Sequence, residues 1–421
     1  MLSSGEARAL CAEADVGTAL SVLRREGVGP VALRGLLSQW EKTGRKSYPS
    51  AVDLVDGHGR STSAAIHVPA GARPGQLGAL VVLHGAGGSG KQVLPQFTTL
   101  GDRVGSAVIC PTARVPPRTG NGLDMAGIFG NRFAKPSWDL RSGDLALAAL
   151  RWARTELGVD PDRCVVAGVS MGGLATWNLG MRFWPHFAAA VPINGALSMW
   201  EMFGTDRRSR ALVPNLRPLP LFVVHGSEDE QIPPHFDRRS VAELRELGHQ
   251  ELEYAEVRGG RHGLETLGLD DGMPLHRRLE QWLTRRRRTG SPVEVRHRAD
   301  EDRHGRAFWV RLGGIGPSEA GEVRAHRRTP GRVVIEVARA ATVTLYLSTE
   351  WAAPGDKIEV SVNGVTSTVR FEPDLATVVA SFKETADPAL IAEQVVSFAV
   401  PRTTAHTPSD TEARDDAAHP I

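Results

Sequence analysis

The sequence predicts an α/β domain built on a doubly wound, mostly parallel sheet, followed by a second, smaller all-β sandwich domain. Between about residues 79 and 257, short apolar runs typical of buried strands alternate with segments of helical periodicity. Strands that alternate with helices in this way form a parallel sheet that is covered on both faces. After a charged linker near residue 289, the chain instead consists of short alternating runs separated by turn residues, which is the pattern of a sandwich.

Length and composition agree with two cores. The 421 residues exceed the about 100–200 residues that one domain usually holds. With 50 basic and 48 acidic residues the net charge is +2, which argues against nucleic acid as a partner. The three cysteines are not closely spaced, so neither a disulfide framework nor a metal site is expected. The arginine run at 285–288 is expected to close a helix and to stay solvated.

Residues 1–45 are expected to form a helical segment, because their leucines and valines recur at mixed three- and four-residue steps. The chain does not open with a basic region followed by an apolar stretch, and it has no apolar run long enough to cross a bilayer. We therefore expect a cytoplasmic protein without a membrane partner. Nothing in the sequence indicates its oligomeric state.

The α/β domain is expected over residues 46–288. It opens with a hairpin about residues 57–59. The strand-like runs that follow are ALVVLHG, SAVICPTA, CVVAGVS, AAAVPING, LPLFVVHG and ELEYAEVR. In such sheets ligands bind at the carboxyl ends of the strands, so a site is expected in the loops that follow these runs.

The β-sandwich, of immunoglobulin-like type, is expected over residues 293–400. Its strand-like runs are FWVRLGGI, RVVIEVA, ATVTLYLS, KIEVSVNG and TSTVRFE, with turns at 354–356 and 363–364. Residues 401–421 hold almost no large apolar side chains, which predicts a disordered tail.

The stretch GVSMG at residues 168–172 is the first chemical signal. It follows a strand-like run and precedes a helix-like one, which is the context in which G-x-S-x-G places a serine nucleophile on a sharp turn. The flanking glycines permit the turn, and the start of the helix favours developing negative charge. The alternative is that Ser170 merely caps the helix, since serine is well suited to that position.

A serine nucleophile needs a histidine base and an acid that orients it, and the expected order along the chain is serine, acid, histidine. Asp229 lies just past a strand end, and His262 lies in a glycine-flanked loop past the next one. His84 and His225 are poorer candidates for the base. Each precedes a glycine at the very end of a strand, where an imidazole more often packs or supports the backbone.

Two other acids compete with Asp229. Glu228 is its neighbour, whereas Asp237 falls inside the next helix and is expected to be solvated. We favour Asp229, which lies in the loop just past the strand end.

The glycine-rich loop LHGAGGSGKQ at residues 83–92 admits two interpretations. As an oxyanion loop it supplies backbone N–H groups that, together with that of Met171, hold a tetrahedral oxyanion. As a phosphate loop it nearly satisfies G-x-x-x-x-G-K-[ST], with Lys91 in register. Gln92, however, stands where a hydroxyl group is needed for Mg²⁺. We favour the oxyanion loop and expect no metal and no cofactor.

Taken together, LHGAGGSG, GVSMGGLATW, AAAVPINGA, HGSEDEQIP and RHG resemble the motifs of the α/β-hydrolase superfamily. The likeness is greatest to its esterase-D, polyhydroxybutyrate-depolymerase and feruloyl-esterase branch, with prolyl-oligopeptidase-type peptidases as neighbours. The second domain is similar, more weakly, to the β-sandwich attached to some bacterial hydrolases of this type. The resemblance implies that Ser170 is the nucleophile, Asp229 the acid and His262 the base.

By the same resemblance, Ala86 and Met171 are the backbone donors of the oxyanion hole. Arg261 departs from the family pattern directly before the histidine, and it is a candidate anchor for a carboxylate or a sugar. Trp138 and Arg141, in the long loop after a strand end, could bind substrate or could anchor that loop. Of two further residues, Trp177 is expected in the core, and Asp144 is expected to cap the helix DLALAALRW.

The implied activity is hydrolysis of a carboxylic ester of a small molecule or saccharide through an acyl-enzyme. A serine peptidase with the same triad remains an alternative. So does a catalytically silent binding protein recruited through its sandwich, although a complete triad in the expected order argues against it. Because the sandwich supplies no triad residue, we expect it to influence substrate access or association and not to build the site.

Overall fold

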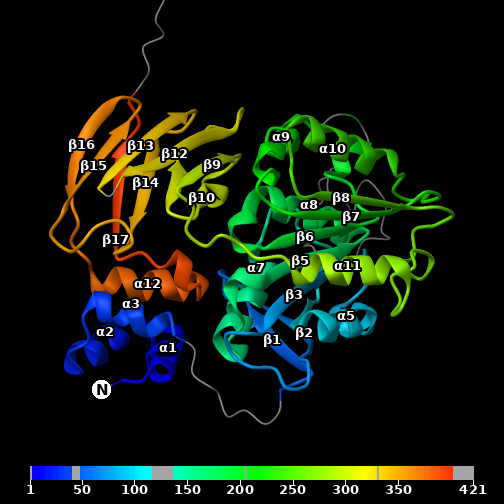
Figure 1. Cartoon of the computed structure of the whole chain (residues 1–421), viewed down its shortest axis with the longest axis horizontal. Helices are drawn as coiled ribbons and strands as arrows, with labels where there is room; N and C mark the ends of the chain where they lie inside the picture. The colour runs from blue at the N-terminus through cyan, green and yellow to red at the C-terminus, as the bar shows by residue number, and fades with distance from the viewer. Residues whose placement is uncertain are drawn as a thin grey trace, which may run out of the picture.

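The computed structural model describes residues 2–39, 48–115, 136–202, 204, 206–329 and 331–401, so all of the expected tail except residue 401 lies outside it. Figure 1 shows the large sheet with its helices in blue to green, and the two smaller sheets beside it in yellow to red. The N-terminal helices lie under the smaller sheets and not under the large one. Within the described residues, no helix is long and apolar enough to span a membrane.

The large sheet has the strand order β1-β2-β4-β3-β5-β6-β7-β8. Strands β1 and β2 form an antiparallel hairpin, β2 pairs with β4 antiparallel, and every later pairing is parallel. Strands β3 to β7 are buried along their whole length, as expected for strands covered on both faces. The strands are β1 (Ala51–Val55), β2 (Ser61–His67), β3 (Gly78–Leu83), β4 (Ser106–Pro111), β5 (Cys164–Val169), β6 (Ala189–Ile193), β7 (Leu221–Gly226) and β8 (Leu252–Val257).

Helices cover both faces of this sheet. Apolar residues of α7, α8 and α10 pack in one cluster with one face, and those of α5 and α11 pack in another cluster with the opposite face. The helices are α4 (Gly90–Val93), α5 (Thr98–Val104), α7 (Asp144–Trp152), α8 (Met171–Phe183), α9 (Arg207–Arg210), α10 (His235–Glu246) and α11 (Pro274–Thr284). Shorter helical turns are η1 (Leu94–Gln96), η3 (Ala153–Leu157), η4 (Pro161–Arg163), η5 (Trp184–His186), η6 (Met199–Met202), η7 (Val213–Leu216) and η8 (Leu264–Thr266).

Asp144 is not the cap of its helix, contrary to our expectation. Helix α7 begins at Asp144 itself, so Gly143 occupies the N-cap position, and the N–H of Asp144 donates to Ser142 Oγ at 3.2 Å. The carboxylate of Asp144 pairs instead with Arg60, at 3.4 Å. Asp144 therefore forms an ion pair with the hairpin residue Arg60 and does not cap its helix. No local sequence pattern predicts this contact.

The second domain consists of two sheets whose apolar faces meet. The strand orders are β10-β11-β14-β17 and β16-β15-β13-β12-β9, and all pairings are antiparallel except that of β13 with β15. Alternate residues along β13 are buried, as in a sheet with one buried face and one solvent-exposed face. The strands are β9 (Glu294–Ala299), β10 (Arg306–Ala307), β11 (Val310–Gly313), β12 (Gly321–Thr329), β13 (Arg332–Ala338), β14 (Thr342–Leu347), β15 (Lys357–Val362), β16 (Val365–Arg370) and β17 (Gln394–Ala399). Helical segments here are η9 (Asp302–His304), α12 (Leu375–Thr385) and η10 (Pro388–Leu390).

The N-terminal segment is helical, as expected, with α1 (Ser4–Glu13), α2 (Val16–Arg25) and α3 (Pro30–Leu37). Local signals start each helix: a capping box at Ser3, the Asp15 side chain, and a proline at the first position of α3. The apolar faces of the three helices pack on α12, around the fully buried Phe382. The two ends of the described chain therefore share one small core.

Buried ion pairs lie at the junction of the domains. The side chain of Arg288 is only 3% exposed, and it donates hydrogen bonds to Asp387 at 2.7 Å and to Asp162 at 2.9 Å. Burial alone would raise the pKa of Asp387, but the adjacent cations of Arg288 and Arg154 hold this pKa below its ordinary value. The expectation that the whole arginine run stays solvated is therefore wrong for Arg288, because two carboxylates from other segments enclose it.

Candidate active site

Ser170 sits between β5 and α8 in a strained backbone conformation. Its φ is 58° and its ψ is −120°, a region that residues other than glycine rarely adopt. The surrounding packing enforces this turn, since a Cβ at Gly172 would lie 2.0 Å from the carbonyl oxygen of Leu83. The Ser170 side chain makes no capping hydrogen bond to α8, so the capping alternative does not describe its contact. Its hydroxyl group lies next to the imidazole of His262 instead.

The structure brings Ser170, His262 and Asp229 together. His262 Nε2 lies 2.7 Å from Ser170 Oγ, and His262 Nδ1 lies 2.7 Å from Asp229 Oδ2. The three residues follow β5, β8 and β7, and these parallel strands end at the same edge of the sheet. The His262 side chain keeps 16% of its surface exposed, whereas that of Asp229 is buried, so a reactant can reach the imidazole but not the carboxylate.

Asp229 is held as an ionised acceptor. Its carboxylate accepts hydrogen bonds from the backbone N–H groups of Gln231 and Ile232, both at 2.9 Å. Burial alone would raise the pKa of Asp229, but contacts with His225 and His262 together with these N–H groups hold the pKa well below its ordinary value. The competing acid, Glu228, has an exposed side chain.

The loop that carries His262 is fixed by Asn194, which follows β6. The Asn194 side-chain amide donates to the carbonyl oxygens of Arg261 and His262, both at 2.9 Å, and its oxygen accepts from the N–H of Gly226 at 2.8 Å. One side chain therefore joins the ends of three neighbouring strands. Sequence reasoning missed this residue, although asparagine in AAAVPING stands at a strand end where such a role is typical.

Behind Asp229 lies a buried polar cluster that the sequence did not reveal. Asp237, in the first turn of α10, is fully buried, so the expectation that it is solvated is wrong. Its two carboxylate oxygens lie 2.9 Å from Trp177 Nε1 and 2.7 Å from His225 Nδ1. The partners are 60 and 12 positions away in the chain, and no local pattern links them. Trp177 is buried, as expected of a core residue.

The two candidate oxyanion donors flank Ser170. Met171 is the first residue of α8, and Ala86 lies in the loop after β3. A Cβ at Gly85 would lie 3.4 Å from Ser170 Cβ, so the backbone of this loop runs directly past the serine. Neither Ala86 N–H nor Met171 N–H is a donor in the turn and loop hydrogen bonds of the described chain.

Packing accounts for the phosphate-loop pattern in the same segment. A Cβ at Gly90 would lie 1.8 Å from the carbonyl oxygen of Cys110, so this position requires glycine to let α4 approach β4. Lys91 is exposed on α4. The glycine and the lysine therefore need no phosphate ligand to explain them.

His84 supports the glycine-rich loop, as expected for an imidazole at a strand end. Its Nε2 accepts from the N–H of Ala113 at 3.0 Å, so the proton resides on Nδ1, which donates to the carbonyl oxygen of Gly85 at 2.7 Å. Burial lowers the pKa of His84, in agreement with a neutral ring. Trp138 donates from Nε1 to the His84 carbonyl oxygen at 2.8 Å, and the two rings lie 4.9 Å apart.

The other two candidate substrate-binding residues differ in their surroundings. Arg141 pairs with Glu301 and, at 3.2 Å, with Asp300, and both belong to the second domain. These contacts correspond to the alternative in which Arg141 anchors its loop. Arg261 has an exposed side chain, and its backbone N–H donates to Thr266 Oγ1 at 2.8 Å.

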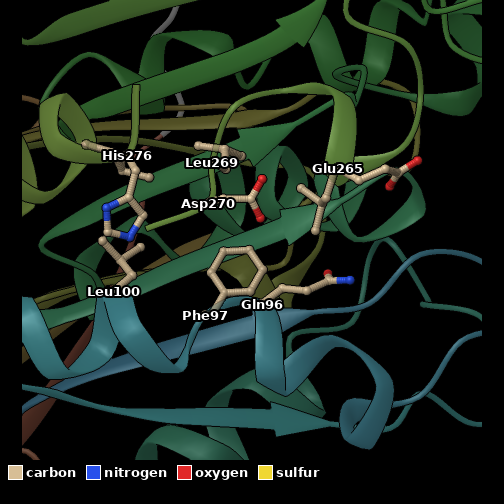
Figure 2. Close-up of a pocket in the computed structure, with 9 residues that line it drawn as sticks. Gln96, Phe97, Leu100, Glu265, Leu269, Asp270 and His276 are labelled. Atoms are coloured by element: carbon tan, nitrogen blue, oxygen red, sulfur yellow. The ribbon is translucent and has the colours of Figure 1, made fainter. Parts of the chain in front are cut away.

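A pocket of about 80 Å³ lies between η1, α5 and the segment that follows His262 (Figure 2). Ser170, Asp229 and His262 do not line it. Its walls are mainly apolar, with two carboxylates, one amide and one imidazole among them. The lining residues are Gln96, Phe97, Leu100, Leu264, Glu265, Leu269, Asp270, His276 and Leu279.

The chain is similar to known hydrolases. No protein-family model matches the chain. Over 184 residues, 40% of this chain and 73% of the relative, the sequence is 29% identical to lysophospholipase-like protein 1 of Mus musculus. Over 131 residues, 30% of this chain and about half (49%) of the relative, it is 25% identical to acyl-protein thioesterase 1 of Emericella nidulans. A solved thermostable esterase is 24% identical, with a TM-score of 0.41 over 56% of this chain and 63% of that chain.

The mostly parallel sheet with helices on both faces and the sharp turn after β5 agree with the expected fold, and the similarity to these relatives supports the same fold. The chain has an α/β-hydrolase, esterase-like fold to which a second, smaller β domain is attached.

Proposed function

We propose that the chain is a serine hydrolase that cleaves carboxylic esters of small molecules or saccharides, and related thioesters, through an acyl-enzyme formed on Ser170. The observation that carries this proposal is the continuous contact from Ser170 Oγ through His262 to Asp229, at 2.7 Å in each step. The similarity to a lysophospholipase-like protein and an acyl-protein thioesterase supports an acyl substrate.

In the proposed acylation step, Ser170 Oγ attacks the carbonyl carbon while His262 Nε2 accepts the hydroxyl proton. The electron pair of the carbonyl bond moves to its oxygen, and the N–H groups of Ala86 and Met171 stabilise the resulting oxyanion. When the intermediate collapses, the bond to the leaving alcohol or thiol breaks, and this group takes the proton from His262.

In the proposed deacylation step, a water molecule attacks the acyl-enzyme with His262 again acting as the base. The carboxylic acid leaves, and the proton returns to Ser170 Oγ. Asp229 keeps the Nδ1–H tautomer of His262 and stabilises the imidazolium that forms in each step. The backbone N–H groups of Gln231 and Ile232 hold the Asp229 carboxylate in place. This favours the proposed role, because a fixed carboxylate needs no reorganisation during the reaction.

The strained backbone at Ser170 supports the same proposal. A serine in an ordinary N-cap conformation directs its oxygen to the first N–H groups of the helix. The positive φ of Ser170 instead leaves Oγ beside His262 Nε2, at a cost in conformational energy of about 1–3 kcal/mol. Strain of this kind persists where the surrounding structure enforces it, which is typical of functional sites.

A panel of p-nitrophenyl esters, a thioester and aminoacyl-nitroanilides, assayed side by side, tests the proposal. Ser170→Ala should remove nearly all hydrolysis and leave only roughly 10³–10⁴-fold catalysis over water. A fluorophosphonate probe should label the wild type but not this variant. Ser397→Ala, an exposed serine on β17, is the matched control and should be labelled like the wild type. Faster cleavage of the nitroanilides would replace the ester assignment by a peptidase.

A further inference from the structure

His225 occupies an unusual position directly behind the proposed acid. It lies at the end of β7, four residues before Asp229, and its side chain is completely buried. Its Nε2 lies 2.8 Å from the carbonyl oxygen of Ile232 and 3.5 Å from Asp229 Oδ2. On the other side of the ring, Nδ1 lies 2.7 Å from Asp237 Oδ2. His225 therefore stands between two buried aspartates.

The contacts define the protonation of this cluster. A carbonyl oxygen only accepts, so His225 Nε2 carries a hydrogen and donates it to Ile232. Asp237 already accepts from Trp177 Nε1 through one oxygen, and its other oxygen faces His225 Nδ1. Burial alone would lower the pKa of His225, but the contacts with Asp229 and Asp237 raise it to about 10. Both aspartates therefore favour the charged form of His225.

On the basis of the proposed function, we propose that His225 is a positioning residue of the site. It lies beside Asp229 Oδ2, the same carboxylate oxygen that faces His262, and its positive charge extends to lower pH the range in which His262 acts as a base. The juxtaposition that carries this inference is one carboxylate oxygen, Asp229 Oδ2, that lies 2.7 Å from the partly exposed imidazole of His262 and 3.5 Å from the buried imidazole of His225.

The direction of the effect follows from electrostatics. A carboxylate stabilises positive charge on the imidazole beside it, and a second cation beside the same carboxylate partly offsets that field. Loss of the cation strengthens the attraction between Asp229 and a proton on His262. The acid limb of the kcat/KM profile, which reports protonation of the base, should then move to higher pH.

The other charged groups around His225 do not change this direction. Glu256 on β8 is its register partner, but Glu256 is neutralised by Arg238, whose guanidinium lies 2.6 Å away. The hydroxyl group of Tyr254 donates to the same Glu256 carboxylate at 2.8 Å, and burial raises the pKa of Tyr254, so it stays neutral. The charges that remain are the two aspartates, His225 and the proton on His262.

The test compares pH profiles of kcat/KM for a p-nitrophenyl ester. His225→Gln should move the acid limb upward by about half a pH unit or more. Because this variant leaves Asp237 without its partner, we pair it with the double variant His225→Gln, Asp237→Asn, which removes both charges and can keep amide hydrogen bonds. The double variant should show a smaller displacement in the same direction, because it removes the anion of Asp237 together with the nearer cation of His225. His249→Gln, which removes a buried imidazole near the opposite end of β7, is the control and should leave the limb in place.

Two results would overturn the inference, and they can be told apart. If folded His225→Gln or the folded double variant loses rate at every pH with an unmoved acid limb, His225 is only a structural residue. If hydrolysis by the wild type survives in Ser170→Ala, the proposed function itself fails and this inference falls with it. Thermal unfolding of each variant shows which profiles come from folded protein.

Discussion

The carboxylate of Asp300, in the second domain, lies 2.9 Å from the guanidinium of Arg182, on the helix that begins directly after Ser170. The Arg182 side chain is 2% exposed and that of Asp300 is 1% exposed, so the pair is sealed between the two domains. Asn178 accepts a second hydrogen bond from Arg182, and His304 lies 2.6 Å from the other oxygen of Asp300. The second domain therefore holds the helix that carries the proposed nucleophile.

Asp300→Asn should destabilise the protein strongly, because it leaves the buried cation of Arg182 without its counter-ion. Breaking a buried ion pair on one side typically costs about 3–5 kcal/mol. Chemical denaturation of the purified variant measures this loss. Glu359→Gln, which removes the exposed pair with Arg332, is the matched control and should unfold almost like the wild type. Equal midpoints for both variants would show that Asp300 contributes little.

Acid should weaken this junction in a defined direction. Burial alone would raise the pKa of Asp300, but His304 and Arg182 hold it well below the ordinary value. A carboxylate with a lowered folded pKa contributes stability that is present above its unfolded pKa of about 3.9 and is lost as the pH falls toward the folded value. The denaturant concentration at the unfolding midpoint should therefore decrease as the pH is lowered below about 4. This decrease should be smaller in Asp300→Asn than in the wild type. Parallel pH dependence in the two proteins would contradict this account.

A protein truncated at Thr289 should not fold as a stable unit. The two domains share one continuous apolar cluster, in which Trp184 of the first domain packs edge to face on Phe308 of the second, with ring centroids 5.1 Å apart. Truncation exposes this surface and leaves Arg182 unpaired. Light scattering, circular dichroism and activity on p-nitrophenyl acetate measure the outcome. A soluble truncated protein with cooperative unfolding and full activity would show that the first domain is independent.

Trp138→Phe should lower kcat more than it changes KM. The variant keeps the ring beside His84 but loses the hydrogen bond to the His84 carbonyl oxygen, which fixes the glycine-rich loop next to Ser170. We expect a loss of about tenfold, smaller than the roughly 10²–10³-fold effect of removing an oxyanion donor itself. Steady-state kinetics on a small activated ester checks this, with Trp351→Phe in the second domain as the control. A change in KM alone would make Trp138 a substrate contact instead.

Lys91→Ala should leave esterase activity unchanged, and the wild type should show no Mg²⁺-dependent ATP binding in calorimetry. By contrast, Gly90→Ala should destabilise the protein, since a Cβ there would meet the Cys110 carbonyl oxygen at 1.8 Å. ATP binding that Lys91→Ala abolishes would restore the phosphate-loop interpretation.

The sequence by itself determined the strands of the large sheet and the places where chemistry was sought, whereas β9, β12 and β17 of the second domain were not among the predicted strands. Strand-like runs that alternate with helical ones fix a parallel sheet, and the carboxyl ends of its neighbouring strands converge whatever the details of packing. Ser170, Asp229 and His262 each follow such a strand end, so their proximity was predictable from local patterns alone. In the same way, the glycines around Ser170 predicted the sharp turn at that residue.

Only the tertiary structure decided which polar groups are buried and what they contact. Asp237 was expected to be solvated, yet it meets Trp177 and His225 in the core. Arg288 was expected to be solvated, yet it meets Asp387 from the far end of the chain. The physical reason is that a charged residue on a helix or linker carries the same local pattern whether or not a partner arrives from a distant segment. Its burial is favourable only when that partner is present.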